Sequence, residues 1–302
     1  MLKPLILTSL TLVTANAFAA TCDRACLRTT LDRYLTALVE HDPSEAPLAI
    51  GFRQTENAVV AVPGTGLWQS ATALGALQRR YFDVATEQAG YFGTIEEAAG
   101  AAIVTLRLKV EDRKITEAEW VINREGDPGL GPLGGGQADA AYHDPEYLLA
   151  HAPVESVVPQ GERVTRGELV AIANSYFDGL SAHYGDIILA HPGCVRIENG
   201  ALTTQRPIEG GGQTDCTSEG AMRNIFAVTA RRYPVVDEEA QAVLSIVLFQ
   251  RYPGVDMRRN LLAEWFFIDA GKIRTVYAAM YYPPPEAMLP NWPPFDGNWP
   301  VK

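Results

Sequence analysis

The sequence predicts an α+β fold built from two copies of one unit, each opening with a helix followed by antiparallel strands. The first observation is a repeat, because one constant shift, which places Leu27 on Leu169, brings identical residues into register over much of each copy. The matches are Leu27/Leu169, Tyr34/Tyr176, Leu38/Leu180, His41/His183, Glu56-Asn57/Glu198-Asn199, Tyr91/Tyr233, Glu96-Glu97/Glu238-Glu239 and Leu106/Leu248. Farther along, Lys114-Ile115 matches Lys272-Ile273 at a larger shift, so copy two is expected to carry about one more β-hairpin.

The second observation is an apolar stripe of helical period at the start of each copy. In copy one the stripe consists of Leu27, Leu31, Tyr34, Leu35 and Leu38. In copy two it consists of Leu169, Ile172, Tyr176, Phe177 and Leu180. The second helix is preceded by Thr165-x-x-Glu168, a capping box that marks a helix start.

The third observation is the series of alternating segments that follows each helix, which indicates antiparallel strands. In copy one, at residues 20–122, strands are expected at 52–62, 91–96, 102–110 and 115–122. In copy two, at residues 165–282, they are expected at 195–204, 230–236, 242–251, 262–268 and 273–281. Short helical turns are expected near 71–82 and 221–227.

Residues 1–19 are predicted to be a secretory signal peptide rather than part of the fold. Lys3 gives a basic start, residues 5–13 are uncharged and mostly apolar, and Ala17-Phe18-Ala19 forms an A-x-A cleavage site. This apolar stretch is shorter than the ~20 residues that span a bilayer, and no later segment is apolar enough to span one. We therefore expect a secreted or periplasmic protein with no membrane span. A buried N-terminal strand is the alternative.

The four cysteines all follow this cleavage site, and an even number is typical of a disulfide framework in an oxidising compartment. We expect a Cys194–Cys216 disulfide, closing a loop that contains Gly210-Gly211-Gly212, and a local Cys22–Cys26 disulfide. Two other connectivities are possible. A zinc site is the competing interpretation, which the lack of a CxxC pair or a His cluster disfavours.

Two segments lie outside the copies. Residues 123–164 form a Gly- and Pro-rich linker in their first half, whereas the second half contains Tyr142-His143-Asp144-Pro145 and a further Tyr and His. A long segment of this kind is either a linker or a functional lid. The C-terminal residues 283–302 hold Trp292 and Trp299 among prolines and are expected to form an extended strap on the surface.

Three groups of residues carry a resemblance to a known family. They are Arg33-Tyr34-x-x-Ala37-Leu38-x-x-x-Asp42 with Glu56-Asn57, Tyr176-x-x-Gly179-Leu180 with Arg196-x-Glu198-Asn199, and Asp269-Ala-Gly-Lys-Ile-Arg274. With these residues, and with a helix followed by antiparallel strands in each copy, the chain resembles two tandem members of the NTF2-like (SnoaL-like) superfamily. The resemblance implies two cones, each a curved sheet around a helix with an open-ended apolar pocket, that pair through their sheets. The superfamily includes ketosteroid isomerase, polyketide cyclases and non-catalytic binders.

Composition and missing motifs narrow the chemistry. With 25 Lys and Arg against 36 Asp and Glu, the formal net charge is −11, which disfavours nucleic acid as a partner. The chain has no G-x-S-x-G elbow, P-loop, dinucleotide fingerprint or H-E-x-x-H, and its five His lack ligand spacing. We therefore expect no metal and no cofactor, so that any catalysis is side-chain acid–base chemistry in a desolvated pocket.

Tyr34 and Tyr176 are the leading catalytic candidates, because they lie on the helix face directed at the sheet. The resemblance implies that a Tyr here donates a hydrogen bond to a developing oxyanion. The general base of those isomerases is an Asp, where this chain has Asn57 and Asn199; Asn199 could orient a substrate but not take a proton. The preceding Glu198 could serve, although strand alternation turns it to the opposite face. A core Tyr hydrogen-bonded within its unit is the alternative.

His41 and His183 follow these tyrosines by two helical turns on a similar face. A His there could act as an acid or a base near neutral pH. It could equally be a helix C-terminal residue that interacts with the helix dipole.

Aromatic residues around copy two suggest where a ligand would bind. Trp265 and Tyr277 in the predicted strands, with Tyr142 and His143 in the connector, are candidate substrate-binding residues. Ordinary packing is the alternative. Copy two is the favoured site, because it has the expected extra hairpin, the cysteine-closed loop and more aromatic residues.

These observations predict a secreted cofactor-independent lyase or isomerase that acts on a small aromatic molecule. Deformylation of a lignin-derived dimer is one example, suggested by analogy within the superfamily. The alternative is a non-catalytic secreted binder of a small apolar ligand. A homo-oligomer is possible in either case.

Overall fold

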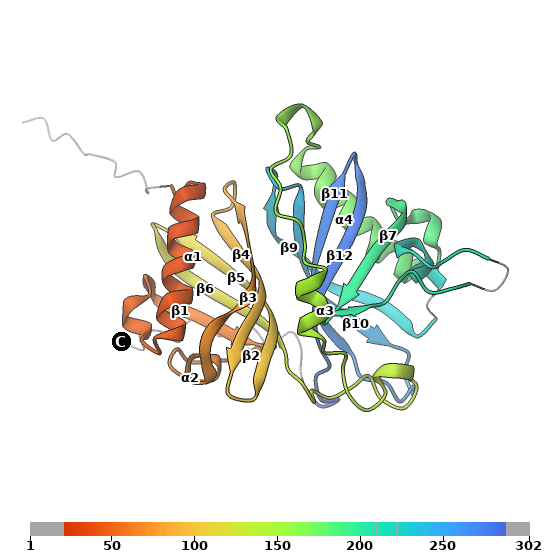
Figure 1. Ribbon diagram of the computed structural model, residues 1–302, viewed down its shortest axis with the longest axis horizontal. Coiled ribbons are helices and arrows are strands. Elements are labelled where there is room, and N and C mark those ends of the chain that lie inside the picture. Colours follow the sequence, from red (N-terminus) through yellow and green to blue (C-terminus); the bar gives the residue numbers. More distant parts are fainter. Residues whose placement is uncertain (1–20, 209–210, 222, 288–302) are drawn as a thin grey trace, which may run out of the picture.

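The computed structural model describes residues 21–208, 211–221 and 223–287, and it contains two six-stranded sheets and a few helices (Figure 1). The predicted signal peptide, Gly210 and the Trp-containing part of the C-terminal strap lie outside the described residues. The fold is α+β, as predicted. The two sheets have the same strand order, which is consistent with a two-domain duplicated fold.

The first unit, residues 21–123, begins with α1 (Arg24–Val39) and η1 (Pro43–Glu45). Its sheet has the order β2-β1-β6-β5-β4-β3, in which β1 and β6 are parallel and the other pairs are antiparallel. The elements that follow are β1 (Leu48–Glu56), β2 (Val59–Val60), α2 (Leu67–Ser70), β3 (Ala71–Asp83), β4 (Gln88–Glu97), β5 (Gly100–Glu111) and β6 (Lys114–Asn123).

The second unit, residues 164–282, begins with α4 (Arg166–Ala182) and η4 (Gly185–Ile187). Its sheet has the corresponding order β8-β7-β12-β11-β10-β9, again with one parallel pair, β7 and β12. The elements are β7 (Ala190–Glu198), β8 (Ala201–Leu202), η5 (Cys216–Ala221), β9 (Ile225–Asp237), β10 (Ala242–Arg251), β11 (Asn260–Asp269) and β12 (Lys272–Tyr281).

Both predicted helices are present, and local chemistry explains where each begins. The Asp23 side chain accepts a hydrogen bond from the backbone N–H of Cys26 at the start of α1 (2.8 Å). Thr165 and Glu168 form the predicted capping box at the start of α4. Both apolar stripes are buried against the sheet of their own unit, so each helix is held mainly by packing.

The other face of each sheet packs against the sheet of the other unit, so that the two sheets lie between the two helices (Figure 1). Residues of both sheets form this interface core, including Leu77, Phe92, Leu244 and Trp265. The two units therefore share one continuous buried face, formed by the two sheets.

Two reciprocal ion pairs tie the units together. Arg24 at the start of α1 makes a bidentate contact with Asp237 at the end of β9 (2.9 and 2.9 Å). Arg166 at the start of α4 makes the equivalent contact with Asp83 at the end of β3 (2.7 and 2.7 Å). Each carboxylate also accepts a backbone N–H from the opposite unit, from Phe82 and from a β9 residue respectively. The interface is therefore pseudo-symmetric: each unit contributes the arginine of one ion pair and the aspartate of the other.

Two sequence predictions about the repeat are wrong: the copies are not related by one constant shift, and the second copy has no extra β-hairpin among the described residues. The shift that places Leu27 on Leu169 also places the start of β1 on the start of β7. Each later strand of the second unit, from β9 to β12, begins farther along the chain than this shift predicts. Tyr91 therefore lies in β4, whereas Tyr233 lies in β9, and the later matches fail in the same way. Among the described residues each unit has six strands, and the extra residues lengthen segments 203–224 and 252–259 instead. Loops tolerate such insertions, whereas strands do not.

The expected helical turn at 71–82 is also wrong, because these residues form most of β3. Ala, Leu, Gln and Arg favour a helix in isolation, but β3 pairs with β4 over nearly its whole length. Tertiary pairing outweighs the local preference. Near 221–227, helical structure ends at Ala221, and β9 begins at Ile225.

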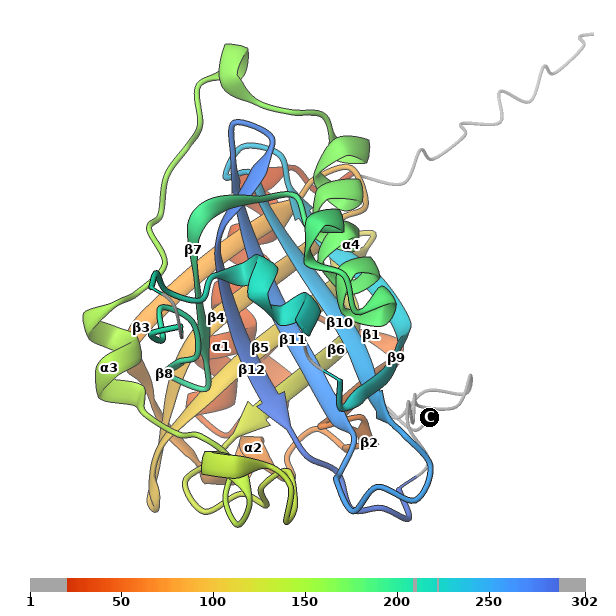
Figure 2. The same cartoon turned by 90° about the vertical axis from the view of Figure 1, so that its right-hand side faces the viewer.

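The connector between the units contains η2 (Gly135–Gln137), α3 (Pro145–Ala150) and η3 (Gln160–Glu162). Figure 2 shows it following one side of the two sheets, with α3 beside β8. The backbone N–H of Asp144 donates to the carbonyl of Asn199, which fixes α3 at the β7–β8 turn (2.9 Å).

Both predicted disulfides are present, Cys22–Cys26 and Cys194–Cys216. Two disulfides fit an extracellular or periplasmic protein. No helix in the described part of the chain has the length and apolar character needed to cross a membrane.

Candidate functional site

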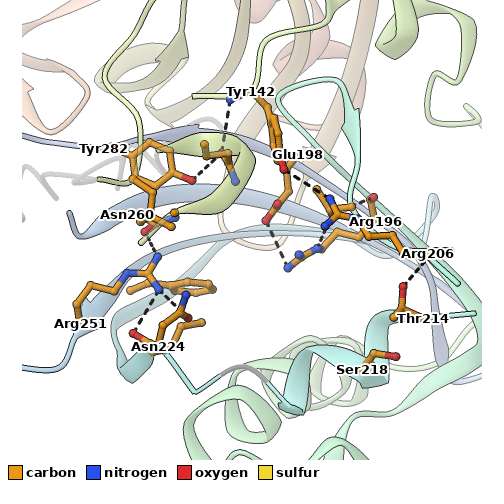
Figure 3. A pocket seen from close by; sticks show the side chains of 16 residues that line it. Tyr142, Arg196, Glu198, Arg206, Thr214, Ser218, Asn224, Arg251, Asn260 and Tyr282 are labelled. Carbon is orange, nitrogen blue, oxygen red and sulfur yellow. Dashed lines mark hydrogen bonds and ion pairs between the residues drawn. The ribbon is translucent and has the colours of Figure 1, made fainter. Parts of the chain in front are cut away.

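The second unit contains a cavity of about 310 Å³ between its sheet, the segment joining β8 to β9, and the connector. Its volume lies at the lower end of the range typical of small-molecule sites. Figure 3 shows its polar side chains converging from these elements. The lining residues are Leu130, Gly134, Gln137, Tyr142, Arg196, Glu198, Thr203, Arg206, Thr214, Ser218, Asn224, Ile225, Phe249, Arg251, Asn260 and Tyr282.

An ion pair on β7 forms one wall of this cavity. Arg196 and Glu198 are next-but-one neighbours on the strand, so both side chains point to the same face. They are 4% and 7% exposed, and Arg196 Nη1 lies 3.3 Å from Glu198 Oε1. Arg196 also donates to Thr203 Oγ1 (3.0 Å) and to the hydroxyl of Tyr176 (2.6 Å). A buried carboxylate and a buried guanidinium that are paired in this way offset part of each other's cost of burial.

The end of β10 supplies a second arginine. Arg251 is half-buried, and its Nη1 donates to Asn224 Oδ1 (3.1 Å), while its Nη2 donates to Asn260 Oδ1. Its Nε donates to the carbonyl of Arg258 (3.2 Å). Burial lowers the pKa of Arg251 to about 10, because the cation is partly removed from water. These neutral acceptors fix the guanidinium without cancelling its charge.

The connector covers the cavity. The Tyr282 hydroxyl donates to Gln137 Oε1 in the connector (2.8 Å), and Arg206 Nη2 donates to the Tyr142 hydroxyl (3.5 Å). Burial raises the pKa of Tyr282, so its hydroxyl stays protonated at neutral pH and is able to donate a hydrogen bond.

In the first unit the corresponding space is filled. Gln54 takes the place of Arg196 and accepts hydrogen bonds from the Tyr34 hydroxyl (2.8 Å) and from Trp68 Nε1 (3.0 Å). Trp120 Nε1 donates to the same Tyr34 hydroxyl (3.1 Å), and both tryptophans are fully buried. Trp68 comes from α2 in segment 61–70, whereas the much longer segment 203–224 takes that place in the second unit. Two tryptophans therefore occupy what remains a cavity in the second unit.

The structure places the predicted tyrosines inside the units but not on the cavity wall. Tyr176 is fully buried and reaches the cavity only through its contact with Arg196. Tyr34 belongs to the hydrogen-bonded core of the first unit.

The predicted asparagine and histidines lie at turns. Asn199 has φ +46°, and its side chain bonds the backbone N–H and carbonyl of Met280 (2.7 and 3.1 Å). His41 and His183 both have positive φ at the ends of their helices. His41 Nδ1 is hydrogen-bonded to the carbonyl of Trp68 (2.6 Å), and His183 Nε2 to the Tyr252 hydroxyl (3.0 Å). The structure does not bring Tyr176, His183 and Asn199 together around one cavity.

The predicted substrate-binding residues divide into two groups. Tyr142 lines the cavity, and its neighbour His143 is hydrogen-bonded to Asn123 instead (2.8 Å). Trp265 and Tyr277 lie between the two sheets, where Trp265 packs on Tyr81 with ring centroids 4.5 Å apart. Strand alternation turns both of these side chains away from the cavity.

Sequence reasoning missed Arg251 and Asn260, and it placed Glu198 on the wrong face. The Arg196-x-Glu198 spacing was the available signal, because two charged residues on one face of an apolar strand are rarely buried without a role. Among the described residues, no group of three or more His, Cys, Asp or Glu side chains is arranged to hold a metal ion.

Comparison with known proteins agrees with the boundaries of the second unit. A family model described as a domain of unknown function (DUF8021) matches residues 162–280, from just before α4 to the end of β12. Solved structures that match include the crystal structure of BvnE pinacolase from Penicillium brevicompactum. That protein is 13% identical with a TM-score of 0.29, and the match covers 38% of this chain and 86% of that chain. No curated protein matches.

Proposed function

We propose that the cavity of the second unit is the active site of a cofactor-independent lyase or isomerase, which uses acid–base chemistry on a small aromatic molecule. The observation that carries this proposal is the buried Glu198, which is paired with Arg196 in a cavity that the first unit fills with tryptophan. A carboxylate on the wall of such a cavity is within reach of a bound substrate, and Glu and Asp side chains act as general bases in this way.

In this proposal Glu198 is the general base. Its carboxylate takes a proton from a carbon next to a carbonyl group, and the electron pair of that C–H bond moves onto the carbonyl oxygen. Arg251 lines the same cavity and would stabilise the resulting oxyanion. The Tyr282 hydroxyl also lines the cavity and donates to Gln137. An isomerase returns the proton to a different carbon. In a lyase, Glu198 takes the proton from a hydroxyl group on the carbon β to the carbonyl, and the O–H electron pair forms the C=O bond of the departing aldehyde. The electron pair of the broken carbon–carbon bond moves onto the carbonyl oxygen as an enolate, and Glu198 then returns the proton to the enolate carbon.

Arg196 and Tyr176 are positioning residues in this scheme. The Tyr176 hydroxyl accepts a hydrogen bond from Arg196, which in turn contacts Glu198. The aromatic walls Tyr142 and Phe249 favour an aromatic substrate. Deformylation of a lignin-derived dimer is the most specific form of the proposal, although a volume of about 310 Å³ favours a single ring.

Two further proposals concern the origin and location of the chain. The equivalent strand orders and the reciprocal Arg–Asp contacts support a tandem duplication of an NTF2-like cone. The two disulfides support secretion, with the mature chain starting after residue 19.

A non-catalytic binder of a small ligand is the second candidate. Its supporting observation is that none of the five His, all of which lie among the described residues, lines the cavity. Glu198 is then the one carboxylate that lines the cavity, with no histidine beside it to act as a partner acid or base.

The test is turnover of a panel of aromatic carbonyl compounds and lignin-type dimers, followed by mass spectrometry with EDTA present. Glu198→Gln should lower turnover roughly 100-fold or more, because it removes the base and keeps the shape. Glu56→Gln is the matched control, since Glu56 takes the same place in the filled first unit, and it should retain activity within about twofold. Equal losses in both variants would overturn the assignment. Binding without any product would favour the second candidate.

A further inference from the structure

We propose that the molecule bound in the second unit carries one carboxylate group, which pairs with Arg251. This inference rests on the proposed function only in using the same cavity, and it names the class of ligand: small aromatic monoacids. Two observations support it: the hydrogen-bond partners of Arg251 are all uncharged, and the equivalent position in the first unit forms an ion pair.

Arg251 is surrounded by acceptors that carry no charge. Asn224, Asn260 and the carbonyl of Arg258 accept its hydrogen bonds, and within the described residues Arg251 forms no ion pair. Glu198, the carboxylate of this cavity, is already paired with Arg196. A partly buried cation without a counter-ion is costly, so a ligand anion at this point is strongly favoured.

The first unit shows what normally balances a charge at this place. Arg251 is the last residue of β10, and the last residue of the equivalent β4 is Glu97. Glu97 pairs with Arg124, with 2.5 Å between Oε2 and Nε. The residue equivalent to Arg124 in the second unit is Tyr282, directly after β12. The first unit therefore contains an internal ion pair at this place, whereas the second unit has an arginine in the position of the carboxylate and a neutral hydroxyl in the position of its partner.

The charge count limits the ligand to one negative charge inside the cavity. The two partly or fully buried arginines, Arg196 and Arg251, and the one carboxylate, Glu198, leave a net charge of +1, with Glu198 in direct contact with Arg196 and near enough to act on Arg251. Arg206 also lines the cavity but is exposed, so water screens its charge. A carboxylate balances Arg251, whereas a phosphate dianion would leave one negative charge uncompensated in a partly buried site.

The geometry of the donors agrees with this choice. Each terminal nitrogen of an arginine carries two hydrogens, and for Nη2 of Arg251 the described residues supply one acceptor, Asn260 Oδ1. The second hydrogen is available to one carboxylate oxygen. The Tyr282 hydroxyl and the aromatic side chains of Tyr142 and Phe249 line the same cavity, so an aromatic ring fits beside the acid group.

The experiment is isothermal titration of the full-length protein with benzoate, benzamide and inorganic phosphate. Benzamide has the shape of benzoate without its charge. Benzoate should bind at least tenfold more tightly than benzamide, and phosphate at least tenfold more weakly than benzoate. Equal affinities for benzoate and benzamide would overturn the inference, and tighter binding of phosphate would overturn the limit to a monoacid.

Variants assign the effect to one side chain. Arg251→Gln should weaken benzoate binding at least tenfold, and Arg251→Lys should restore part of it. Arg274→Gln is the control, because it makes the same change of net charge at an exposed ion pair, and it should bind benzoate within twofold of wild type. Unchanged benzoate binding in Arg251→Gln would refute the proposal, while the wild-type comparison of benzoate with benzamide does not depend on any variant folding.

Failure of this inference can be distinguished from failure of the proposed function. Glu198→Gln should bind benzoate at least as tightly as wild type, because it removes a nearby negative charge. Benzoate binding that depends on Arg251, in a protein without turnover, would support this inference and refute the enzyme. Turnover that depends on Glu198, with benzoate and benzamide binding equally, would refute this inference and leave the enzyme standing.

Discussion

The reciprocal ion pairs between the units give a quantitative prediction for Asp237→Asn. The Asp237 side chain has no exposed surface, and it accepts hydrogen bonds from Arg24 and from the backbone N–H groups of Phe82, Glu239 and Ala240. The substitution keeps the shape and removes the charge, which leaves Arg24 with a neutral amide and with Glu239 as its remaining carboxylate partner (3.2 Å). Breaking one partner of a buried pair costs about 3–5 kcal/mol. Because Arg24 is 26% exposed, we expect the lower end of this range, about 3 kcal/mol.

Urea denaturation of the full chain measures this free energy of unfolding. The equivalent variant Asp83→Asn should lose a similar amount, since Asp83 contacts Arg166 in the same way. Asp269→Asn is the control, because its partner Arg274 and Asp269 itself are 57% and 52% exposed, and such pairs contribute about 0–1 kcal/mol. If Asp237→Asn and Asp83→Asn lost no more than this control, the interface would not depend on the reciprocal pairs.

Three further predictions concern the units themselves. Trp120→Ala should cost about 3–5 kcal/mol of unfolding free energy, because it opens a cavity in the first unit, and it should leave turnover unchanged; a large loss of turnover without unfolding would contradict this. Reduction of the Cys194–Cys216 bridge should lower the unfolding free energy by about 3 kcal/mol, and an unchanged thermal midpoint would argue against it. Burial alone would raise the pKa of Glu97, but hydrogen bonds, chiefly from Arg124, lower it below 4.5. The ionised Glu97 therefore adds to the free energy of unfolding above pH 4.5, and this contribution is lost as the pH falls through the lower pKa of Glu97 in the folded state. The stability deficit of Glu97→Gln at neutral pH should therefore shrink in acid, whereas a deficit independent of pH would refute this.

Much of the fold follows from short-range signals in the sequence. The stripes around Tyr34 and Tyr176, the capping box at Thr165 and the two cysteine pairs depend on residues close together in the chain or on compartment chemistry. These predictions are confirmed. The strand β3 was missed because its Ala- and Leu-rich sequence favours a helix locally, and only pairing with β4 decides otherwise.

The charged site could not be predicted, because its residues are compared with their equivalents in the first unit only when the two copies are aligned strand by strand. One constant shift does not align them. The equivalence of Arg251 with Glu97 and of Tyr282 with Arg124 appears only when the strands are matched one by one, since the shift grows between β10 and β12. The face of Glu198 was misjudged for a local reason. Asn199 was treated as a strand residue, but it begins the turn after β7, so alternation does not continue through it.

The central claim is that the second unit, and not the first, holds a small-molecule site. A crystal structure of the full-length protein soaked in benzoate tests this claim most directly. We expect one benzoate in the cavity of the second unit, with its carboxylate at hydrogen-bonding distance, about 2.7–3.2 Å, from Arg251, and none beside Trp68 and Trp120. A cavity that stays empty at saturating benzoate, or a benzoate bound in the first unit, would contradict the account.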